Sequence, residues 1–356
     1  MRTNLLAIVL IGAVSACQPT PAPEAGATRT WTFEQGVLFP AARGLSRAED
    51  GVVLSDGRIV VVDQRHGLAV IGTDGSVRPF GTFAEAGYVH APPASVAGPN
   101  GVALEPDGAN LLVADVFTGA IYRVNIASEA TSRIYTHPFG VNTVVSDSSG
   151  AIWFTQSTEN PAGPESEMRL LSVPMTQFVA DGALFRIAPA AADGMLPPPQ
   201  RVLGDLAFAN GIVIDEKRGE LYLAETMADQ VTGYKLSLAD GALTDRRVVA
   251  SVMSPDNIEM DDAGLLWAAS PVRSEVVTIN PDTGQTVSVF RAQTAANDTM
   301  SEEWKRRSAT REPVLDLFTP DLWAPMPGLV TGVVLTPGGG PVYVSGLADV
   351  LLKLEQ

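Results

Sequence analysis

Short apolar runs alternate with polar, glycine-bearing turns along most of this chain. The clearest runs are rich in β-branched and aromatic residues and cover residues 57–63, 111–115, 150–155, 219–225, 264–269 and 340–345. Each run has the length of one strand and lies between turn residues, which is typical of β-structure. A third run often follows, as at 120–124 and 276–279, and turns such as Asp74-Gly75 and Asp240-Gly241 lead to a fourth.

These runs belong to a unit that recurs six times. Each unit begins with a polar residue, passes through a small or apolar residue into a strand, and reaches a second strand after a Gly-bearing turn. The units begin at Glu49-Asp50-Gly51, Asn100-Gly101, Asn142-Thr143, Asn210-Gly211, Asp256-Asn257-Ile258 and Thr331-Gly332. Each unit has four strands, and three of the five distances between the starts of consecutive units are 42 to 50 residues. These features predict an all-β fold, a six-bladed β-propeller with four antiparallel strands per blade. Residues 31–356 are expected to form it as a single domain.

Two steps between units are longer because they carry insertions near residues 159–178 and 297–327. The first is polar and contains proline, and the second is partly helical in pattern at 301–307 before a Pro-rich return. Long insertions in a compact scaffold are often lids or binding loops. Decoration of an outer edge is the alternative, and the sequence does not decide between them.

Four aromatic residues recur at one register of the second strand, namely Trp153, Tyr222, Trp267 and Tyr343. Residues at a repeated register of a propeller pack against the neighbouring blade. We expect them to fill the space between blades and assign them no function.

The first 16 residues have the pattern of a signal peptide. Arg2 is followed by a short apolar run at 5–14, too short for a comfortable membrane span, and the segment ends at the single cysteine, Cys17. The pattern resembles a bacterial lipoprotein signal, which implies a lipid on Cys17 and, with Gln18 next to it, an outer-membrane location facing the periplasm. An ordinary secretory signal with a leftover cysteine is the alternative. Residues 17–30 are rich in Pro and Ala and are expected to act as a tether.

Charge and cysteine content argue against nucleic acid and anionic lipid as partners and against disulfide bonds within the chain. The chain has a net charge of −16 and no basic run long enough to hold phosphates, so nucleic acid is not an expected partner. The same acidity disfavours docking on anionic lipid, which leaves the lipid anchor as the only expected membrane contact. With one cysteine there is no disulfide within the chain, and a monomer is expected.

The polar residues that open the units are the candidates for chemistry. The first strand of each blade lines the central channel, so equivalent openers face one another near one mouth. Five of the six carry a carboxylate or an amide, and crowded buried carboxylates repel unless they are neutralised. Calcium takes six to eight oxygen ligands from such groups, and a site without His or Cys favours calcium over zinc or copper. Against this, Asn and Asp before Gly are also common turn formers.

Four of these stretches carry a family resemblance. Residues 48–51, 141–143, 208–212 and 255–258 resemble the calcium-binding stretches of the senescence-marker/gluconolactonase lactonases and of the paraoxonase/arylesterases, and the resemblance runs from about Leu45 to the end. It implies that the metal ligands shared by both groups are Glu49, Asn142, Asn210 and Asp256. Asp50 and Asn257 match additional ligands of the paraoxonase-like site.

The histidines depart from the paraoxonase pattern. Paraoxonases carry a histidine at the head of the second blade and another at the end of its next strand, where this chain has Asn100 and Val116. A histidine-dyad mechanism and phosphotriester hydrolysis are therefore not inferred. The three histidines present, His66, His90 and His137, are expected in turns or loops or at the surface rather than as a base, with His137 the nearest to a blade opening.

The resulting hypothesis is a calcium-dependent hydrolase of a lactone or ester. The ion would polarise the carbonyl, Asp256 or secondly Glu49 would accept the proton of water, and Asn100 and Asn142 would bind the substrate. No Gly-x-Ser-x-Gly elbow, zinc motif or phosphate-binding glycine loop occurs. The alternative is a non-catalytic, lipid-anchored propeller with a structural calcium that binds a ligand or partner, and a lyase or isomerase is a third possibility.

Overall fold

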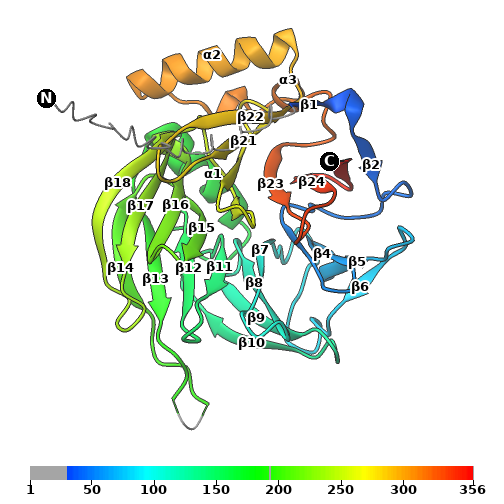
Figure 1. The fold of residues 1–356 in the computed structure, drawn as a ribbon, viewed down its shortest axis with the longest axis vertical. Coiled ribbons are helices and arrows are strands. Elements are labelled where there is room, and N and C mark those ends of the chain that lie inside the picture. The colour runs from blue at the N-terminus through cyan, green and yellow to red at the C-terminus, as the bar shows by residue number, and fades with distance from the viewer. Residues whose placement is uncertain (1–29, 192–193, 356) are drawn as a thin grey trace, which may run out of the picture.

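The computed structural model describes residues 30–191 and 194–355. Its strands form six sheets arranged as blades around one axis, so the six-bladed β-propeller expected from the repeat is confirmed (Figure 1). The signal peptide, Cys17 and most of the expected tether lie outside the described residues.

Four blades take their strands consecutively from the chain. Their strands are β3 (Gly51–Val53), β4 (Ile59–Asp63), β5 (Gly67–Ile71) and β6 (Val77–Phe80); β7 (Pro99–Leu104), β8 (Asn110–Asp115), β9 (Ala120–Asn125) and β10 (Thr131–Thr136); β11 (Val144–Ser146), β12 (Ile152–Gln156), β13 (Gly182–Ile187) and β14 (Gln200–Leu206); and β15 (Ala209–Asp215), β16 (Glu220–Glu225), β17 (Gln230–Leu236) and β18 (Leu243–Ser251).

The last two blades are completed by the N-terminal segment. The fifth consists of β19 (Ile258–Met260), β20 (Leu266–Ser270), β21 (Glu275–Ile279) and β22 (Thr286–Arg291), and the sixth of β23 (Val330–Val334), β24 (Val342–Gly346) and β25 (Leu351–Leu354). β1 (Trp31–Thr32) pairs parallel with β22, and after the short 3-10 helix η1 (Phe33–Gln35), β2 (Val37–Phe39) pairs antiparallel with β25. The start of the domain therefore joins the fifth blade to the sixth and closes the ring.

The innermost strands approach closely at the points where they begin. The backbone N–H of Gly101 donates to the carbonyl of Asn142 at 3.0 Å, and that of Asn257 donates to the carbonyl of Thr331 at 3.0 Å. A Cβ at Gly101 would lie 2.9 Å from Thr143 Cα, and one at Gly211 would lie 2.5 Å from the Ile258 nitrogen. The glycine after the opener thus lets the next blade pass, which explains why Asn-Gly recurs.

The recurring aromatic residues pack between blades, as predicted. Trp153 lies in a buried cluster with residues of the fourth blade, and Trp267 in one with residues of the sixth. Each indole N–H also donates to an aspartate of its own hairpin, Trp153 to Asp147 at 2.8 Å and Trp267 to Asp261 at 2.9 Å. The equivalent hydrogen bond in each blade holds the two rings at the same register.

Both insertions are helical. The first contains α1 (Ser166–Gln177), whose helical form was not predicted, and the second contains α2 (Ala295–Thr310), the 3-10 helix η3 (Leu315–Leu317) and α3 (Pro320–Trp323). They share an apolar cluster with Met175 from α1 and Trp304 from α2. α1 lies toward the middle of the ring and α2 at its rim (Figure 1). No helix within residues 30–191 and 194–355 is long and apolar enough to cross a bilayer.

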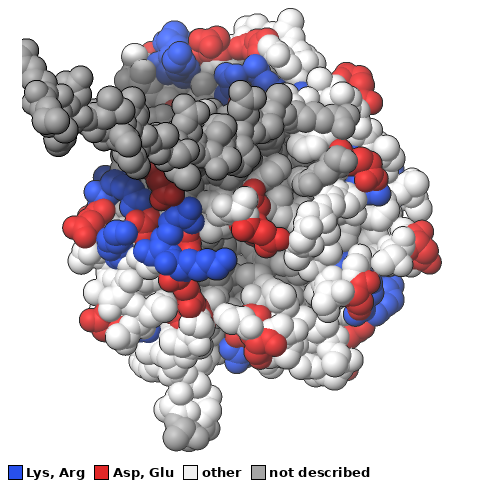
Figure 2. All heavy atoms as spheres, in the orientation of Figure 1, with Lys and Arg blue, Asp and Glu red and all other residues white. Residues whose placement is uncertain are grey.

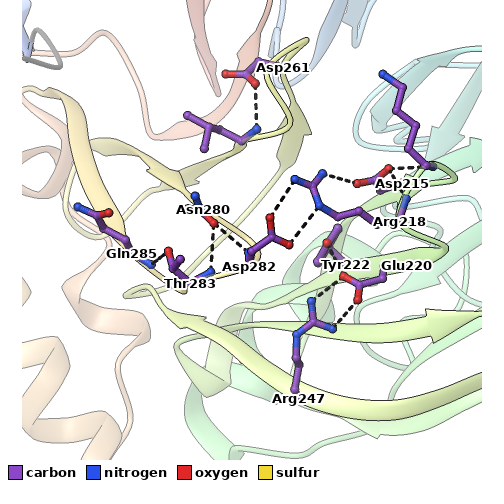
Figure 3. A network of polar contacts seen from close by, with 12 residues as sticks. Asp215, Arg218, Glu220, Tyr222, Arg247, Asp261, Asn280, Asp282, Thr283 and Gln285 are labelled. Atoms are coloured by element: carbon purple, nitrogen blue, oxygen red, sulfur yellow. Dashed lines mark hydrogen bonds and ion pairs between the residues drawn. The ribbon is translucent and has the colours of Figure 1, made fainter. Parts of the chain in front are cut away.

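Ion pairs join neighbouring blades at the opposite end, where the first strands finish. Arg218, between β15 and β16, binds Asp215 of its own blade at 2.7 Å and Asp282 of the fifth blade at 3.3 Å (Figure 3). Burial alone would raise the pKa of nearby Glu220, but hydrogen bonds from Arg247, Lys235 and Tyr222 outweigh it and lower that pKa to about 2. On the face shown in Figure 2, acidic and basic side chains are interspersed around the rim, with acidic ones near the hollowed centre.

Candidate active site at the start of the inner strands

The openers of all six blades are buried at one end of the propeller. The residues are Glu49, Asp50, Asn100, Asn142, Asn210, Asp256, Asn257 and Thr331, and none is more than 8 % exposed. Backbone hydrogen bonds join consecutive inner strands at this level, including Gly211 N–H to the carbonyl of Asp256 at 3.3 Å. Five blades therefore bring a carboxylate or amide, and the sixth a hydroxyl, to one ring.

Three oxygens of this ring are buried without a hydrogen bond, although one of them, Glu49 Oε2, forms an ion pair with Arg47 Nη2 at 3.0 Å. They are Oε2 of Glu49, Oδ1 of Asn210 and Oδ1 of Asp256, which come from the first, fourth and fifth blades. A buried oxygen with no donor costs about 1–3 kcal/mol, and more when it is charged. Three such acceptors in one ring form an environment that a cation would satisfy.

A neighbouring threonine fixes the free oxygen of Asn210. The Asn210 amide nitrogen donates to Thr226 Oγ1 at 3.1 Å, and the Thr226 hydroxyl in turn donates to the carbonyl of Pro255 at 2.7 Å. Since the hydroxyl proton is already used, Thr226 can only accept from Asn210. The amide is therefore held with its nitrogen toward Thr226 and its oxygen without a donor.

The two carboxylates with free oxygens repel each other. Burial, and then the charge of Glu49, raise the pKa of Asp256 well above its ordinary value, while the adjacent amide of Asn210 offsets part of the shift. Burial likewise raises the pKa of Glu49, against the opposing effects of Arg47 and Asn100. Glu49 and Asp256 thus interact across the blades. Their site favours a bound proton or cation over two ionised carboxylates without a counter-ion.

Asp50 serves a different purpose from Glu49. Its two carboxylate oxygens accept backbone N–H groups, that of Gly51 at 2.8 Å and that of Val102 at 2.9 Å. These bonds tie the first blade to the second, and burial nevertheless raises the pKa of Asp50 to about 7. Asp50 lies in the ring as predicted, but both of its oxygens are already occupied by protein donors.

The remaining amides are bonded to one another. Asn100 Nδ2 donates to Asn142 Oδ1 at 3.2 Å, and the Thr143 hydroxyl lies 3.1 Å from Asn142 Oδ1 and 3.4 Å from Asn257 Oδ1. The oxygens of Asn142 and Asn257 therefore have donors, whereas Asn257 Nδ2 is buried without an acceptor. The structure places Asn142 and Asn257 in the ring but leaves the free acceptors to Glu49, Asn210 and Asp256.

The donor set suits a hard cation. It offers two carboxylates and amide oxygens, with no thiolate or imidazole, which is the ligand chemistry of calcium rather than of zinc or copper. Within the described residues, no group of three His, Cys, Asp or Glu side chains is arranged to hold a metal. Any ion here would therefore depend on the amides as well as the two acids.

An apolar layer covers this mouth of the channel. Phe117 packs with Leu170 of α1 and with Phe208, which lies two residues before Asn210. α1 is anchored over the mouth by the Ser166 hydroxyl, which donates to the carbonyl of Phe117 at 2.9 Å. The first insertion thus covers the ring of openers, while α2 and α3 support it from the rim over the fifth blade.

His137 is not a surface residue. It is buried among aromatic rings, with the ring centroid of Phe185 at 4.6 Å and that of Phe154 at 5.2 Å. Its Nε2 contacts Gln156 Oε1 at 2.9 Å, and burial lowers its pKa. It is a buried neutral side chain between the second and third blades, and no hydrogen bond joins it to the openers.

The other end of the channel holds a cavity of about 550 Å³. Its lining is mostly aliphatic, including Val53, Leu104 and Ile214, and the half-buried Glu259 faces it. Burial, and then the charge of Asp50, raise the pKa of Glu259 to about 8. The openers do not line this cavity, so it is separate from the candidate site.

Comparison with known proteins finds one family model that matches part of the chain. Residues 135–300 match the family model described as the SMP-30/gluconolactonase/LRE-like region, a segment that includes Asn142, Asn210 and Asp256. The match covers a little under half of the chain. The recognition made from the opener motifs is thereby confirmed at the level of the superfamily.

Solved structures with the same fold superpose on nearly the whole domain. A gluconolactonase from Xanthomonas campestris is 20 % identical with a TM-score of 0.59, and the match covers 90 % of this chain and 94 % of that one. A luciferin-regenerating enzyme is 13 % identical with a TM-score of 0.56, covering 90 % and 95 %. At this identity the superpositions establish the fold. No curated protein matches the sequence.

Sequence reasoning missed residues that support the candidate site from outside the openers. Thr226 orients Asn210, Ser345 donates to the carbonyl of Glu49 at 2.8 Å, and Arg47 pairs with Glu49 at 3.0 Å. Thr226 and Ser345 lie at or just after the end of a second strand, so the repeat could have identified that position. Arg47 repeats in no other unit and had no such signal.

Proposed function

We propose that this chain is a calcium-dependent hydrolase of a lactone or another carboxylic ester, acting at the ring of openers. The observation that carries the proposal is the pair of unpartnered buried oxygens of Asn210 and Asp256 beside the buried carboxylate of Glu49, which has an ion pair with Arg47 but leaves Oε2 without a hydrogen bond. The gluconolactonase fold and the SMP-30/gluconolactonase-like region support the choice of lactones.

Glu49, Asn210 and Asp256 would hold the ion, and Asn142 would join them as a further oxygen ligand by giving up the hydrogen bond that its Oδ1 accepts from Asn100. A bound calcium ion supplies charge that polarises the substrate carbonyl and stabilises the oxyanion formed on it. Asp50 and Asn257 would support the ion site from their positions in the ring. Asp50 does so by accepting backbone N–H groups of the first and second blades. Oxygen ligands from three or more blades also make the ion a link that closes the ring.

Asp256 is the residue we assign to proton transfer. Its raised pKa suits a carboxylate that takes a proton from water as the water oxygen adds to the carbonyl carbon. When the ester carbon–oxygen bond breaks, the same proton passes to the leaving oxygen. Glu49 is the second candidate, but its Oε2 is paired with Arg47 Nη2 at 3.0 Å, and the charge of Arg47 opposes the rise that burial causes in the pKa of Glu49.

Asn100 and Asn142 are assigned to substrate binding. Asn100 Nδ2 donates to Asn142 Oδ1 at 3.2 Å and to the Asn142 carbonyl at 3.4 Å, which holds the two amides together at the site, where the Asn142 amide nitrogen would donate to a substrate oxygen. The apolar layer of Phe117, Leu170 and Phe208 would exclude bulk water from the reaction. Substrate entry then requires α1 to move from the mouth.

The closed state of the site favours a second candidate, a binding module with a structural calcium. Every opener is buried, and Leu170 of α1 packs with Phe117 and Phe208 beside them. In this function the ion would stabilise the ring, and a ligand or partner would bind at another surface. Measurement of turnover separates the two candidates.

The test offers the purified protein a panel of lactones and aryl esters, with chelator and with added calcium. Turnover that disappears with chelator and returns with calcium supports the hydrolase. A calcium-dependent rise in melting temperature without any turnover supports the binding module. Export and attachment through a lipid on Cys17 remain part of the proposal, based on the leader sequence alone.

A further inference from the structure

Arg47 is held over the candidate site by a backbone turn. Its φ is +56°, in the left-handed region that residues other than glycine rarely adopt. The N–H of Glu49 donates back to the carbonyl of Arg47 at 2.9 Å, and the N–H of Ala48 donates to the carbonyl of Ala348 at 3.1 Å. These bonds fix a strained conformation just before a proposed metal ligand, where such strain commonly serves a site.

The turn directs a guanidinium group into the ring. Arg47 Nη2 lies 3.0 Å from Glu49 Oε2, and the guanidinium carbon lies 5.0 Å from the centroid of the Phe117 ring. Stacking on Phe117 is the usual way to support a planar cation at a recognition site. The positive charge also acts on Asp256, whose pKa it lowers against the larger effect of burial.

Part of this group has no partner in the protein. The Arg47 side chain is largely enclosed, and its Nη1 is buried and makes no hydrogen bond. A charged donor left without an acceptor in such a place is costly, and a guanidinium normally uses its parallel N–H groups as a pair on one planar anion. The free Nη1 beside the Nη2 that already faces Glu49 therefore indicates an acceptor that arrives with a ligand.

We propose that Arg47 binds a carboxylate of the substrate, so that the preferred substrate is a lactone bearing a second, ionised carboxyl group. The inference rests on the proposed function. In the free protein Glu49 occupies one edge of the guanidinium. With a cation bound, the charge of Glu49 would be shared with that ion and its pairing with Arg47 would weaken, so both Nη groups could face the incoming carboxylate.

The chemistry of the guanidinium supports a carboxylate over a neutral oxygen. Arg47 is desolvated by Phe117 and enclosed by the first blade, where a neutral hydroxyl would leave the charge uncompensated. A bidentate carboxylate satisfies both the charge and the paired N–H geometry. The other lining groups, Asn100 and Asn142, are neutral and suit the hydroxyl groups of the same molecule.

The experiment uses two lactones that differ at one carbon. D-galactono-1,4-lactone carries a hydroxymethyl group where D-galactaro-1,4-lactone carries a carboxylate. We expect the wild-type protein, with calcium, to have the higher kcat/KM for the acidic lactone. In Arg47→Gln the ratio of the two kcat/KM values should fall by roughly 10-fold or more, as expected for losing a charge-assisted hydrogen-bond pair.

A control and a second readout separate this idea from the proposed function. Arg65→Gln removes a half-exposed arginine that lies 3.8 Å from Asp63 on the same blade, and should leave the ratio unchanged. D-galactarate, titrated calorimetrically at constant free calcium, should bind Arg47→Gln at least 10-fold more weakly than wild type, with Arg47→Lys in between. This binding readout does not need turnover, so it tests Arg47 even if the protein is not a hydrolase.

Two outcomes would overturn the inference. One is an equal loss of kcat/KM on both lactones in Arg47→Gln, which would assign Arg47 to the reaction centre or to folding instead. The other is unchanged galactarate binding in a variant whose melting temperature shows that it is folded. In contrast, a wild-type protein that hydrolyses no lactone but binds galactarate through Arg47 would refute the proposed function and keep the anion site.

Discussion

The side-chain nitrogen of Asn210 donates to the hydroxyl of Thr226 at 3.1 Å, and this bond leaves the Asn210 oxygen facing the ring without a donor. Thr226 therefore acts on the site without lying in it. It lies just after the end of β16, and its own proton goes to the carbonyl of Pro255, on the segment that leads to Asp256. One hydroxyl thus orients a proposed ligand from the fourth blade and anchors the chain that carries a ligand of the fifth.

Replacing Thr226 with valine tests this arrangement at nearly constant volume. Without the hydroxyl, the Asn210 amide is free to rotate and can present its nitrogen to the ion. We expect calcium affinity to fall by roughly 10-fold, the lower end of the range for partners that orient metal ligands. Calorimetry measures it, and Thr232→Val, which removes another buried hydroxyl of the same blade, is the matched control. Equal calcium affinity in both variants would contradict the assignment of Thr226.

Asp256→Asn removes one of the two charges that face the proposed ion while keeping the shape of the side chain. Losing a unit charge near an ion costs about 4 kcal/mol at an effective dielectric of 20, and the remaining amide oxygen recovers part of it. We expect calcium binding to weaken by roughly 100-fold and calcium-dependent turnover to disappear. Asn210→Ala should also abolish turnover, since it removes a neutral ligand.

The control for Asp256→Asn is Asp282→Asn, which breaks an exposed inter-blade pair with Arg218 far from the openers. Exposed pairs of this kind contribute at most about 1 kcal/mol. Activity and calcium affinity should both be retained in Asp282→Asn. If Asp256→Asn also retains full turnover and full calcium affinity, Asp256 is neither ligand nor base.

The propeller can be predicted from sequence because its repeated features have local causes. Glycine follows the opener at 101, 211 and 332 because a Cβ there would meet the neighbouring backbone or the side chain of Ser345. The apolar second strands are buried on both faces, so they appear as unbroken runs. The opener positions could be found for the same reason, since equivalent positions in a closed ring must converge.

The contacts that decide the chemistry are not repeated and could not be predicted. Arg47 reaches Glu49 only because its backbone is left-handed, a conformation that an arginine in sequence does not indicate. α1 covers the mouth through Leu170 and Ser166, but Pro174 and several polar residues hide its helical pattern. Asp50 and Glu49 also differ in ways that the sequence does not show, since the oxygens of Asp50 accept backbone N–H groups whereas Glu49 Oε2 is paired with Arg47.

Gly211→Ala tests the close approach of the inner strands. The added methyl group would lie 2.5 Å from the Ile258 nitrogen and 2.9 Å from the Asp256 carbonyl oxygen, so the backbones of the fourth and fifth blades must separate. We expect a loss of about 1–3 kcal/mol in the free energy of unfolding, measured in urea, together with weaker calcium binding. Gly108→Ala, where the methyl group meets nothing within 4 Å and only the positive φ is strained, should lose less and bind calcium normally.

Cys17→Ser tests the lipoprotein interpretation of the leader. The lipid would be attached through the thiol, and the part of the chain that the structure describes offers no membrane-spanning helix as a substitute. We expect the variant to move from the membrane fraction to the soluble fraction when cells of the source organism are fractionated. Unchanged membrane association would refute the anchor without touching the propeller site.

The buried carboxylates predict how stability depends on pH in the absence of calcium. Burial raises the pKa of Asp50 to about 7, and it raises those of Glu49 and Asp256 in the same direction. Between pH 4 and 7 the folded protein therefore holds protons that the unfolded chain has released, so stability falls as pH rises through this window. For Asp50 alone the loss is roughly 4 kcal/mol, because each pKa unit is worth about 1.4 kcal/mol.

Calcium should reverse this trend, because the ion requires the carboxylates in their ionised form. Urea unfolding at pH 5, 6, 7 and 8 with chelator should show declining stability, and saturating calcium should add more stability at pH 8 than at pH 5.

His137 acts in the opposite sense, since its lowered pKa favours the neutral form and its contribution is lost as pH falls below about 6.5. Repeating the series in His137→Phe removes that contribution. Calcium-free stability that rises steadily from pH 5 to pH 8 in this variant would show that the openers are not a cluster of strained acids.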